Sequence, residues 1–345
     1  MTEPLLEIED LHVSFHTDEG TVRAVEGISF TIDEGETLGL VGESGAGKSV
    51  ASLSILNLIQ SPPGEIERGS IRFRGEDILN MTPERLRNVR GGEIGMIFQD
   101  AETALNPAHT VGRQIAETVQ LHQDVTEAQA WERAVEMLEQ VGIPDPVERA
   151  DEYPHQFSGG MQQRAMIAIA LANNPSLLIA DEPTTALDVT IEAAILDLLE
   201  DLKDEFDMSM LFISHDLSVI SEVCDHIGVM YAGELVEVGS VERVYREPRH
   251  PYTHGLLESI PTAHEKVDEL TPIEGSMPAG TDRPSGCRFH PRCPAAMENC
   301  STVEPELVEI DGRDVACHLY PEPVGDPGSA AEVENQARLE VLRHE

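Results

Sequence analysis

The sequence predicts an α/β protein whose core is a parallel β-sheet, and three observations indicate this fold class. Short apolar segments alternate along the chain with segments that suit helices. A glycine-rich loop of the phosphate-binding type follows one apolar segment. Polar residues follow others, at the edge where ligands meet the carboxyl ends of parallel strands. The expected core strands are 37–41, 94–99, 177–182, 210–214 and 227–230.

The glycine-rich loop at 42–49 has the sequence GESGAGKS and fits the pattern G-x-x-x-x-G-K-[ST] between a strand and a helix. Such a loop wraps its backbone N–H groups around a phosphate chain, and the helix N-terminus adds positive potential. Lys48 should bind the outer phosphates and Ser49 should ligate Mg²⁺. A plain glycine-rich turn is the alternative, but only three lysines occur in the chain, so a chance match is rare. The residues predicted to contact the nucleotide here are Gly42, Glu43, Ser44, Gly45, Ala46, Gly47, Lys48, Ser49 and Val50.

The composition is strongly acidic, with 64 acidic against 23 basic residues and a net charge of −41 spread along the chain. Charge of this size repels nucleic acid and anionic lipid, so a nucleic-acid partner is disfavoured. The balance resembles that of proteins from salt-loving organisms, where salt screens self-repulsion. The sequence shows no apolar run long enough to span a bilayer and no signal peptide at its start, so a cytoplasmic protein is expected.

Residues 5 to 40 should form short strands that look like an antiparallel layer beside the phosphate-binding core. Apolar stretches separated by glycine turns predict strands at 6–8, 11–15 and 28–32. A helix should run from the phosphate loop to about Gln60, and a hairpin is expected at 70–75 after a proline-rich break.

A helical insert is expected to separate the two halves of the core, from about residue 100. Thr126 followed by Gln129 is a capping box, which begins an amphipathic helix that should end near Gly142. Apolar residues recur at helical spacing at Ala128, Trp131, Val135 and Leu138.

Polar residues at strand ends are the candidates for chemistry. Asp181 could face Mg²⁺, while Glu182 could polarise an attacking water. Gln99 could contact both the cation and the water, and His215 should lie on the nucleotide side of the sheet. The alternatives are a solvated strand end for Asp181 and Glu182, a surface residue for Gln99 and a satisfied structural histidine for His215.

A second anion site is predicted where a helix begins at Ser158. Ser158 is a suitable N-cap, and Gly159 and Gly160 expose backbone N–H groups ahead of Met161. One triphosphate needs only one cradle, so the economical explanation is a dimer in which this second cradle closes on the partner's nucleotide.

Four of the five cysteines gather in the last fifth of the chain, which favours a metal site over disulfides in a cytosolic protein. Their spacing lacks the C-x-x-C knuckle of a zinc ribbon. A [4Fe–4S] cluster, zinc and unmetallated thiols all remain open on this basis. The candidate ligands are Cys287, Cys293, Cys300 and Cys317.

The order of these motifs resembles that of the nucleotide-binding subunits of ABC transporters, over roughly residues 5 to 250. The resemblance implies a P-loop NTPase fold of the ABC type, with Lys48 and Ser49 on phosphates and Mg²⁺. Asp181 would hold Mg²⁺, which Ser49 and Gln99 would also ligate, and Glu182 would be the catalytic base.

The same resemblance assigns the remaining site residues. His215 would be the switch histidine, Gln99 the loop that couples to the membrane domain, and Asp188 a contact across the dimer. Phe15 matches the aromatic that stacks on adenine, with a core Phe as the alternative. The signature differs from the usual Leu-Ser-Gly-Gly-Gln, because Phe157 and Met161 flank Ser158-Gly159-Gly160.

Further motifs look like those of the oligopeptide/dipeptide importer ATPases: Tyr153 to Met161, His250 to Thr253, and Val50 after Ser49. Val50 resembles the D member of the paired D and F subunits, which implies an F-type ATPase partner, or self-pairing. The family implies two permease subunits, indirect work with an extracellular binding protein, and a [4Fe–4S] cluster on the four cysteines, with zinc as alternative.

The expected function is therefore ATP hydrolysis that drives di- or oligopeptide import, on the cytoplasmic face of the membrane. Nickel, glutathione or oligosaccharide import, or a soluble non-transport ABC ATPase, are the alternatives. The expected domains are an ATP-binding domain at 4–256 with a helical subdomain at about 100–172, a small cysteine-rich domain at 257–322, and an acidic tail at 323–345.

Overall fold

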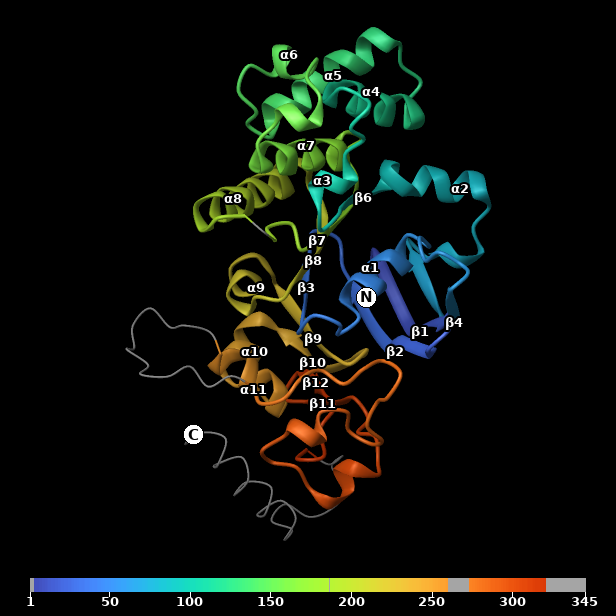
Figure 1. Cartoon of the computed structure of the whole chain (residues 1–345), viewed down its shortest axis with the longest axis vertical. Helices are drawn as coiled ribbons and strands as arrows, with labels where there is room; N and C mark the ends of the chain where they lie inside the picture. The colour runs from blue at the N-terminus through green and yellow to red at the C-terminus, as the bar shows by residue number, and fades with distance from the viewer. Residues whose placement is uncertain (1–2, 186, 260–272, 321–345) are drawn as a thin grey trace. The chain divides into compact units, whose positions relative to one another are not determined.

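The structure, a computed structural model, describes residues 3–185, 187–259 and 273–320, and it forms two compact units (Figure 1). Unit 1 comprises Met1–Leu6, Thr31–Thr37 and Arg72–Ile213, and unit 2 comprises Glu7–Phe30, Leu38–Ile71 and Ser214–Glu345. The predicted acidic tail lies outside the described residues.

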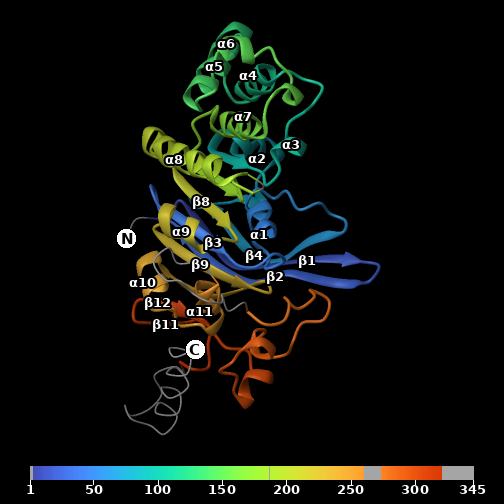
Figure 2. The ribbon, with the colours of Figure 1, turned by 60° about the vertical axis from the view of Figure 1, so that its left-hand side comes forward.

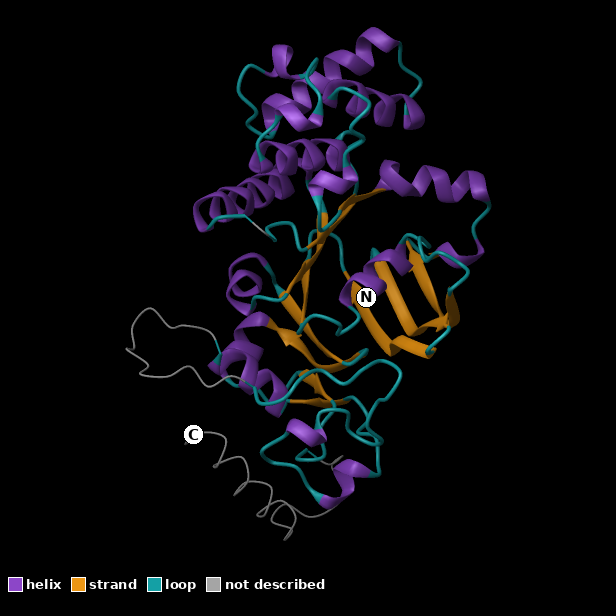
Figure 3. Ribbon diagram, viewed as in Figure 1, coloured by secondary structure: helices purple, strands orange, loops and turns teal. Residues whose placement is uncertain are grey.

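Unit 2 contains most of a small sheet in which β2 (Gly20–Ile32), β1 (Leu6–Thr17) and β4 (Gly64–Phe73) are neighbours in that order. Figure 3 shows these three strands side by side. The two short strands expected at 6–8 and 11–15 are one strand, with a local distortion at Asp10, whose φ is 47°. Asp10 is exposed, so the distortion costs no core packing and the strand continues through it.

Unit 2 also contains the strand that leads into the phosphate loop, β3 (Thr37–Val41), which pairs in parallel with β9 (His226–Tyr231). Antiparallel pairing continues this sheet through β10 (Glu234–Ser240), β12 (Arg313–Val315) and β11 (Val308–Ile310). The two strands between Cys300 and Cys317 thus belong to the same unit and the same sheet as the strand that leads into the loop. The predicted boundary at 257 stays a prediction. The helices of unit 2 are α1 (Lys48–Ile55), α9 (Leu217–Val223), α10 (Val241–Arg246) and α11 (Pro251–Glu258), with η4 (His290–Arg292) and η5 (Glu298–Ser301).

Unit 1 is built on three parallel strands, β6 (Ile94–Ile97), β7 (Leu177–Asp181) and β8 (Ser209–Ser214). β7 and β8 are buried along their whole length, as expected of a parallel core strand covered on both faces. The parallel core is thereby confirmed. Unit 1 also contains β5 (Glu76–Asp77), η1 (Ile78–Asn80), α2 (Pro83–Asn88), η2 (Val89–Glu93) and α8 (Val189–Phe206).

The helical insert lies within unit 1, and Figures 1 and 2 both show its helices gathered together. The capping box at Thr126 and Gln129 is present, and the helix that it begins ends at Gln140, close to the predicted end at Gly142. Of the residues predicted on its apolar face, Leu138 is buried, Trp131 and Val135 are half-buried and Ala128 is exposed. The remaining buried positions include Ala130 and Ala134. The insert consists of α3 (Ala101–Ala104), α4 (Val111–His122), α5 (Glu127–Gln140), α6 (Pro146–Arg149), η3 (Pro154–Gln156) and α7 (Gly159–Leu171).

The helix after the phosphate loop is shorter than predicted, because α1 ends at Ile55 and not near Gln60. Asn57 adopts φ 49°, and its N–H donates to the Ser54 carbonyl. A left-handed residue that closes the last turn is a common way to end a helix. The predicted hairpin is present, since Arg72 pairs with Asp77, but its first strand begins earlier, at Gly64.

Across the part of the chain that the structure describes, every helix is too short or too polar to cross a bilayer.

Candidate functional site

The phosphate loop of unit 2 is closed around its own lysine. The Lys48 ammonium donates to the carbonyl oxygens of Gly42, at 2.7 Å, and Glu43, at 3.2 Å, and the side chain is only 4 % exposed. The Ala46 N–H donates to the Glu43 carbonyl at 3.1 Å and narrows the turn. A buried cation among carbonyls is thus already positioned where the loop's N–H groups would receive an anion.

Two glycines of the loop have no room for a side chain. A Cβ on Gly42 would overlap the carbonyl oxygen of Met230, and one on Gly47 would overlap that of Ala24. Gly47 also has φ 105° at the N-cap of α1, a conformation that other residues rarely adopt. The close approach of neighbouring backbone therefore explains the glycine pattern.

The strand ends of unit 1 bring Gln99 and Glu182 together, as the sequence predicts for the ends of neighbouring parallel strands. The Gln99 amide donates to the Glu182 carboxylate at 2.9 Å, and the Thr185 hydroxyl donates to the same oxygen at 2.9 Å. Glu182 has φ 47°, which turns the chain directly after β7. Such strained residues cluster at functional sites. Asp181, one residue earlier, ends β7 and is 4 % exposed.

The predicted second anion site is an exposed helix start. Ser158 caps α7, and its hydroxyl accepts the Met161 N–H at 3.4 Å. A Cβ added to Gly159 would meet nothing within 4 Å, whereas one on Gly160 would lie 3.1 Å from the Ile191 side chain of α8. The helix start is confirmed, and its contact with a partner's nucleotide stays a prediction.

The other predicted site residues lie on separate elements. His215 is exposed directly after β8. Asp188 is exposed and caps α8, since its carboxylate accepts the Ile191 N–H at 3.1 Å. Phe15 is half-buried on β1. The proposed roles of these three residues stay predictions.

Three residues at these sites escaped the sequence reasoning. Thr185 touches Glu182, while Tyr252 and Arg292 both bond to Glu43 of the loop. Thr185 lies only three residues after Glu182, so its contact with Glu182 could have been predicted from the sequence. Tyr252 and Arg292 are 209 and 249 residues away from Glu43, and no local signal links them to it.

The four clustered cysteines are all reduced. Burial raises the pKa of Cys287 to about 11 and that of Cys293 to about 12, and neighbouring cysteines add to both shifts. Burial also raises the pKa of Cys317, with contributions from all three other cysteines. The Cys287 N–H donates to the Cys300 carbonyl at 2.8 Å, and Cys293 and Cys317 pack against the same two residues, Ala295 and Leu319. Within residues 3–185, 187–259 and 273–320, however, no three His, Cys, Asp or Glu side chains are arranged to hold a single metal ion.

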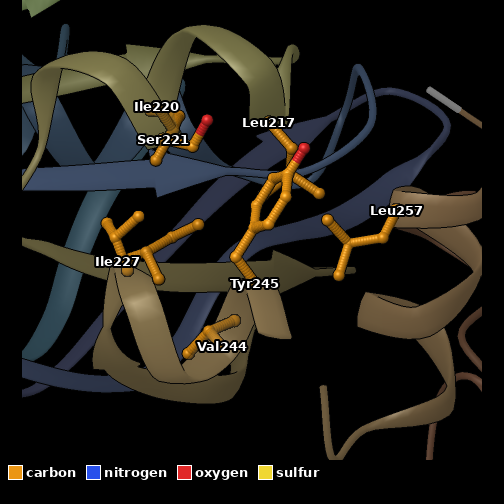
Figure 4. A pocket seen from close by; sticks show the side chains of 8 residues that line it. Leu217, Ile220, Ser221, Ile227, Val244, Tyr245 and Leu257 are labelled. Carbon is orange, nitrogen blue, oxygen red and sulfur yellow. The ribbon is translucent and has the colours of Figure 1, made fainter. Parts of the chain in front are cut away.

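An apolar pocket also lies in unit 2, between α9, β9, α10 and α11 (Figure 4). Its lining contains no ionisable group apart from the Tyr245 phenol, so it offers nothing to a polyphosphate. Its lining residues are Leu217, Ile220, Ser221, Ile227, Val241, Val244, Tyr245 and Leu257.

The phosphate loop, the strand-end carboxylates with Gln99, and the capped Ser-Gly-Gly helix together define an ATPase of the ABC class. The comparisons with known proteins agree. The family profile described as ABC transporter matches residues 25–185. The profile described as oligopeptide/dipeptide transporter, C-terminal region, matches residues 236–300.

Curated relatives match over nearly the whole chain. The oligopeptide transport ATP-binding protein OppD of Bacillus subtilis is 52 % identical, over 89 % of this chain and 86 % of its own length. The dipeptide transport ATP-binding protein DppD of Escherichia coli is 46 % identical, over 94 % of this chain and 99 % of its own.

Solved structures match the fold. A dimeric post-hydrolysis state of the ATP-binding cassette MJ0796, bound to ADP and Pi, gives a TM-score of 0.61 at 26 % identity, over 68 % of this chain and 98 % of that one. The cbiO1 protein of Clostridium perfringens gives 0.60 at 27 % identity, over 71 % and 92 %. This chain belongs to the oligopeptide/dipeptide transporter family of ABC ATP-binding proteins.

Proposed function

We propose that this protein hydrolyses ATP to drive import of di- or oligopeptides through separate membrane permease subunits. The observation that carries the hydrolytic part is the Gln99–Glu182–Thr185 arrangement at the ends of parallel strands. The names of the relatives support the peptide substrate. Import of nickel, glutathione or an oligosaccharide by the same ATPase is the second candidate.

In this proposal Lys48 binds the outer phosphates, and its enclosure by the loop carbonyls supports that role. Mg²⁺ would be held by Ser49, Asp181 and Gln99, which offer the hydroxyl, carboxylate and amide oxygens that this hard cation prefers. The Asp181 carboxylate ends the parallel strand β7, at the edge of the sheet where ligands bind, which supports its role. The cation would neutralise charge that develops on the phosphates.

Glu182 is the proposed general base, which takes a proton from the attacking water. Hydrogen bonds from Gln99 and Thr185 to one carboxylate oxygen fix the orientation of the Glu182 side chain, as a general base requires. His215 would sense the outer phosphate, and Ser158 to Met161 with Asp188 would act across a dimer. The dimer partner would be an F-type ATPase subunit or a second copy. The complex would lie on the cytoplasmic face of the membrane.

The four cysteines are proposed to hold a [4Fe–4S] cluster, with zinc as the alternative. The Cys287 N–H donates to the Cys300 carbonyl, and Cys293 and Cys317 pack against the same two buried residues, Ala295 and Leu319, which supports a shared site. Iron, sulfide and zinc analysis of anaerobically purified protein separates the two, and stoichiometric zinc without iron overturns the cluster.

Replacement of Glu182 by Gln tests the ATPase proposal. The amide keeps the shape and the Gln99 neighbour but cannot accept a proton, so kcat should fall by about 10²- to 10⁴-fold while ATP still binds. The exposed Glu139→Gln on α5 is the matched control and should leave kcat unchanged. Steady-state hydrolysis by the transporter complex is the measurement, and full activity of Glu182→Gln would rule out the assignment.

A further inference from the structure

Glu43 attaches the first turn of the phosphate loop to other parts of unit 2. Its backbone N–H donates to the Tyr252 hydroxyl at 2.9 Å, and its carbonyl accepts from Lys48. Its carboxylate accepts two bonds from the same nitrogen of Arg292, at 3.0 and 3.2 Å. Backbone and side chain are both anchored, so the conformation of the loop's first turn depends on these partners.

The Arg292 guanidinium is itself held in place. Its Nε donates to the Glu274 carbonyl at 2.9 Å, and the side chain is only 7 % exposed. It lies over the rings of Tyr231 and Phe289, at 5.8 and 6.0 Å from their centroids. A guanidinium that is hydrogen-bonded and stacked in this way has a fixed orientation, because its side chain retains little rotamer freedom.

The same aromatic cluster supports both partners of Glu43. Tyr231 packs edge-on against Tyr252, with ring centroids 4.7 Å apart, and against Phe289 at 5.2 Å. Tyr231 and Tyr252 are at most 1 % exposed. The Glu43 N–H and the Glu43 carboxylate are thus fixed by one rigid, buried support.

The segment that carries Arg292 also forms hydrogen bonds to residues that lie next to the loop. Arg283 donates to the Glu26 carboxylate at 2.7 Å, and Arg288 donates to the Ala232 carbonyl at 2.6 Å. The next residue, Gly233, donates its N–H to the Ala46 carbonyl inside the loop at 2.9 Å. Residues 283–292 therefore brace the loop from a part of the chain that also carries Cys287 and precedes Cys293.

The negative charge of Glu43 gives the ion pair with Arg292 an electrostatic role in addition to its structural one. A carboxylate within a loop that receives polyphosphate repels its ligand, and the repulsion is strong where the dielectric constant is low. Arg292 pairs with this carboxylate in a largely buried position. Removal of one partner from a buried pair leaves the other charge uncompensated.

We propose that Arg292 is a positioning residue for ATP binding: it neutralises Glu43 and holds the first turn of the phosphate loop in its binding conformation. The inference rests on the proposed function, in that this loop binds ATP. It extends that function by assigning a loop-supporting role to the cysteine-bearing segment.

The test is Arg292→Met in the full chain, with MgATP and MgADP affinities measured by calorimetry. Met keeps the apolar stem and removes the charge, so the Kd for MgATP should rise about tenfold, and that for MgADP less, because ADP carries less charge. In the transporter complex KM for ATP should rise while kcat at saturating ATP changes little. The exposed Arg246→Met on α10, which removes a surface ion pair with Glu242, is the matched control and should change neither.

Glu43→Gln separates electrostatics from packing. The double variant Glu43→Gln with Arg292→Met should recover MgATP affinity to within about threefold of Glu43→Gln alone, because the uncompensated charge is gone. Failure of that rescue, or an unchanged Kd in Arg292→Met, overturns the proposal. If Arg292→Met does not fold, Glu43→Gln alone decides: it should bind MgATP at least as tightly as the native chain, and a tenfold loss overturns the proposal.

Lys48→Ala distinguishes failure of the inference from failure of the proposed function. It should abolish MgATP binding whatever Arg292 does. Unchanged binding in Lys48→Ala refutes the nucleotide site itself, whereas loss in Lys48→Ala with none in Arg292→Met refutes only the role of Arg292.

Discussion

The phosphate loop of unit 2 and the cluster of Gln99, Glu182 and Thr185 in unit 1 differ in how rigidly the structure holds them. The loop is fixed by backbone: Gly42 and Gly47 have no free space, and Lys48 is buried. The Gln99–Glu182–Thr185 cluster consists of side chains, and Gln99 is exposed while Glu182 is half-buried. A binding element can be preformed, whereas a hydrolytic element left open to solvent can be completed when the nucleotide and a partner arrive.

The largest effect should come from Gly47→Ala, which disturbs the rigid phosphate loop. The new Cβ would overlap the Ala24 carbonyl, and φ 105° is strained for alanine, so the free energy of unfolding should fall by about 2–4 kcal/mol. Gly159→Ala at the open start of α7 is the matched control and should lower it by less than about 0.5 kcal/mol. Urea denaturation measures both, and equal losses would show that the loop is not especially confined.

A second test concerns the buried histidine that begins α11 beside the loop's anchor. Burial lowers the pKa of His250 to about 3, and its Nδ1 accepts the Tyr252 N–H. The folded pKa lies below the ordinary value of about 6.5, so the unfolded chain binds the proton first. The stabilisation is fully present above pH 6.5 and is lost as the pH falls toward 3.

His250→Asn keeps a capping acceptor without the titration, so its stability should fall less between pH 6.5 and 4 than that of the native chain. The difference should be about 1–3 kcal/mol by chemical denaturation. Comparison of the two chains removes the contribution of other groups, such as Glu234, whose pKa burial raises to about 8. Parallel pH profiles would contradict the expectation.

The smallest effect should come from Thr185→Ala, in the more solvent-exposed Gln99–Glu182–Thr185 cluster. It removes one of two hydrogen bonds to Glu182, so kcat should fall about three- to tenfold with KM for ATP unchanged. The exposed Thr190→Ala on α8 is the control and should keep kcat. A rise in KM without loss of kcat would mean that Thr185 serves binding, which would blur the distinction between the two regions.

Local patterns in the sequence predicted the phosphate loop, the capping box at Thr126 and the N-cap at Ser158, and the structure has all three elements. Each depends on a few consecutive residues whose backbone chemistry allows few conformations. The Gln99–Glu182 contact was also within reach, because the ends of parallel strands meet at one edge.

Tertiary structure decided what those patterns could not. The packing of the whole chain buried Ala130 and Ala134 on α5, and it paired the strands between Cys300 and Cys317 with the sheet that contains β3. It also brought Arg292 to Glu43 across 249 residues. Sequence determines local conformation through short-range sterics and hydrogen bonds, but which distant side chains meet depends on how the whole chain packs, and no periodicity or motif records that.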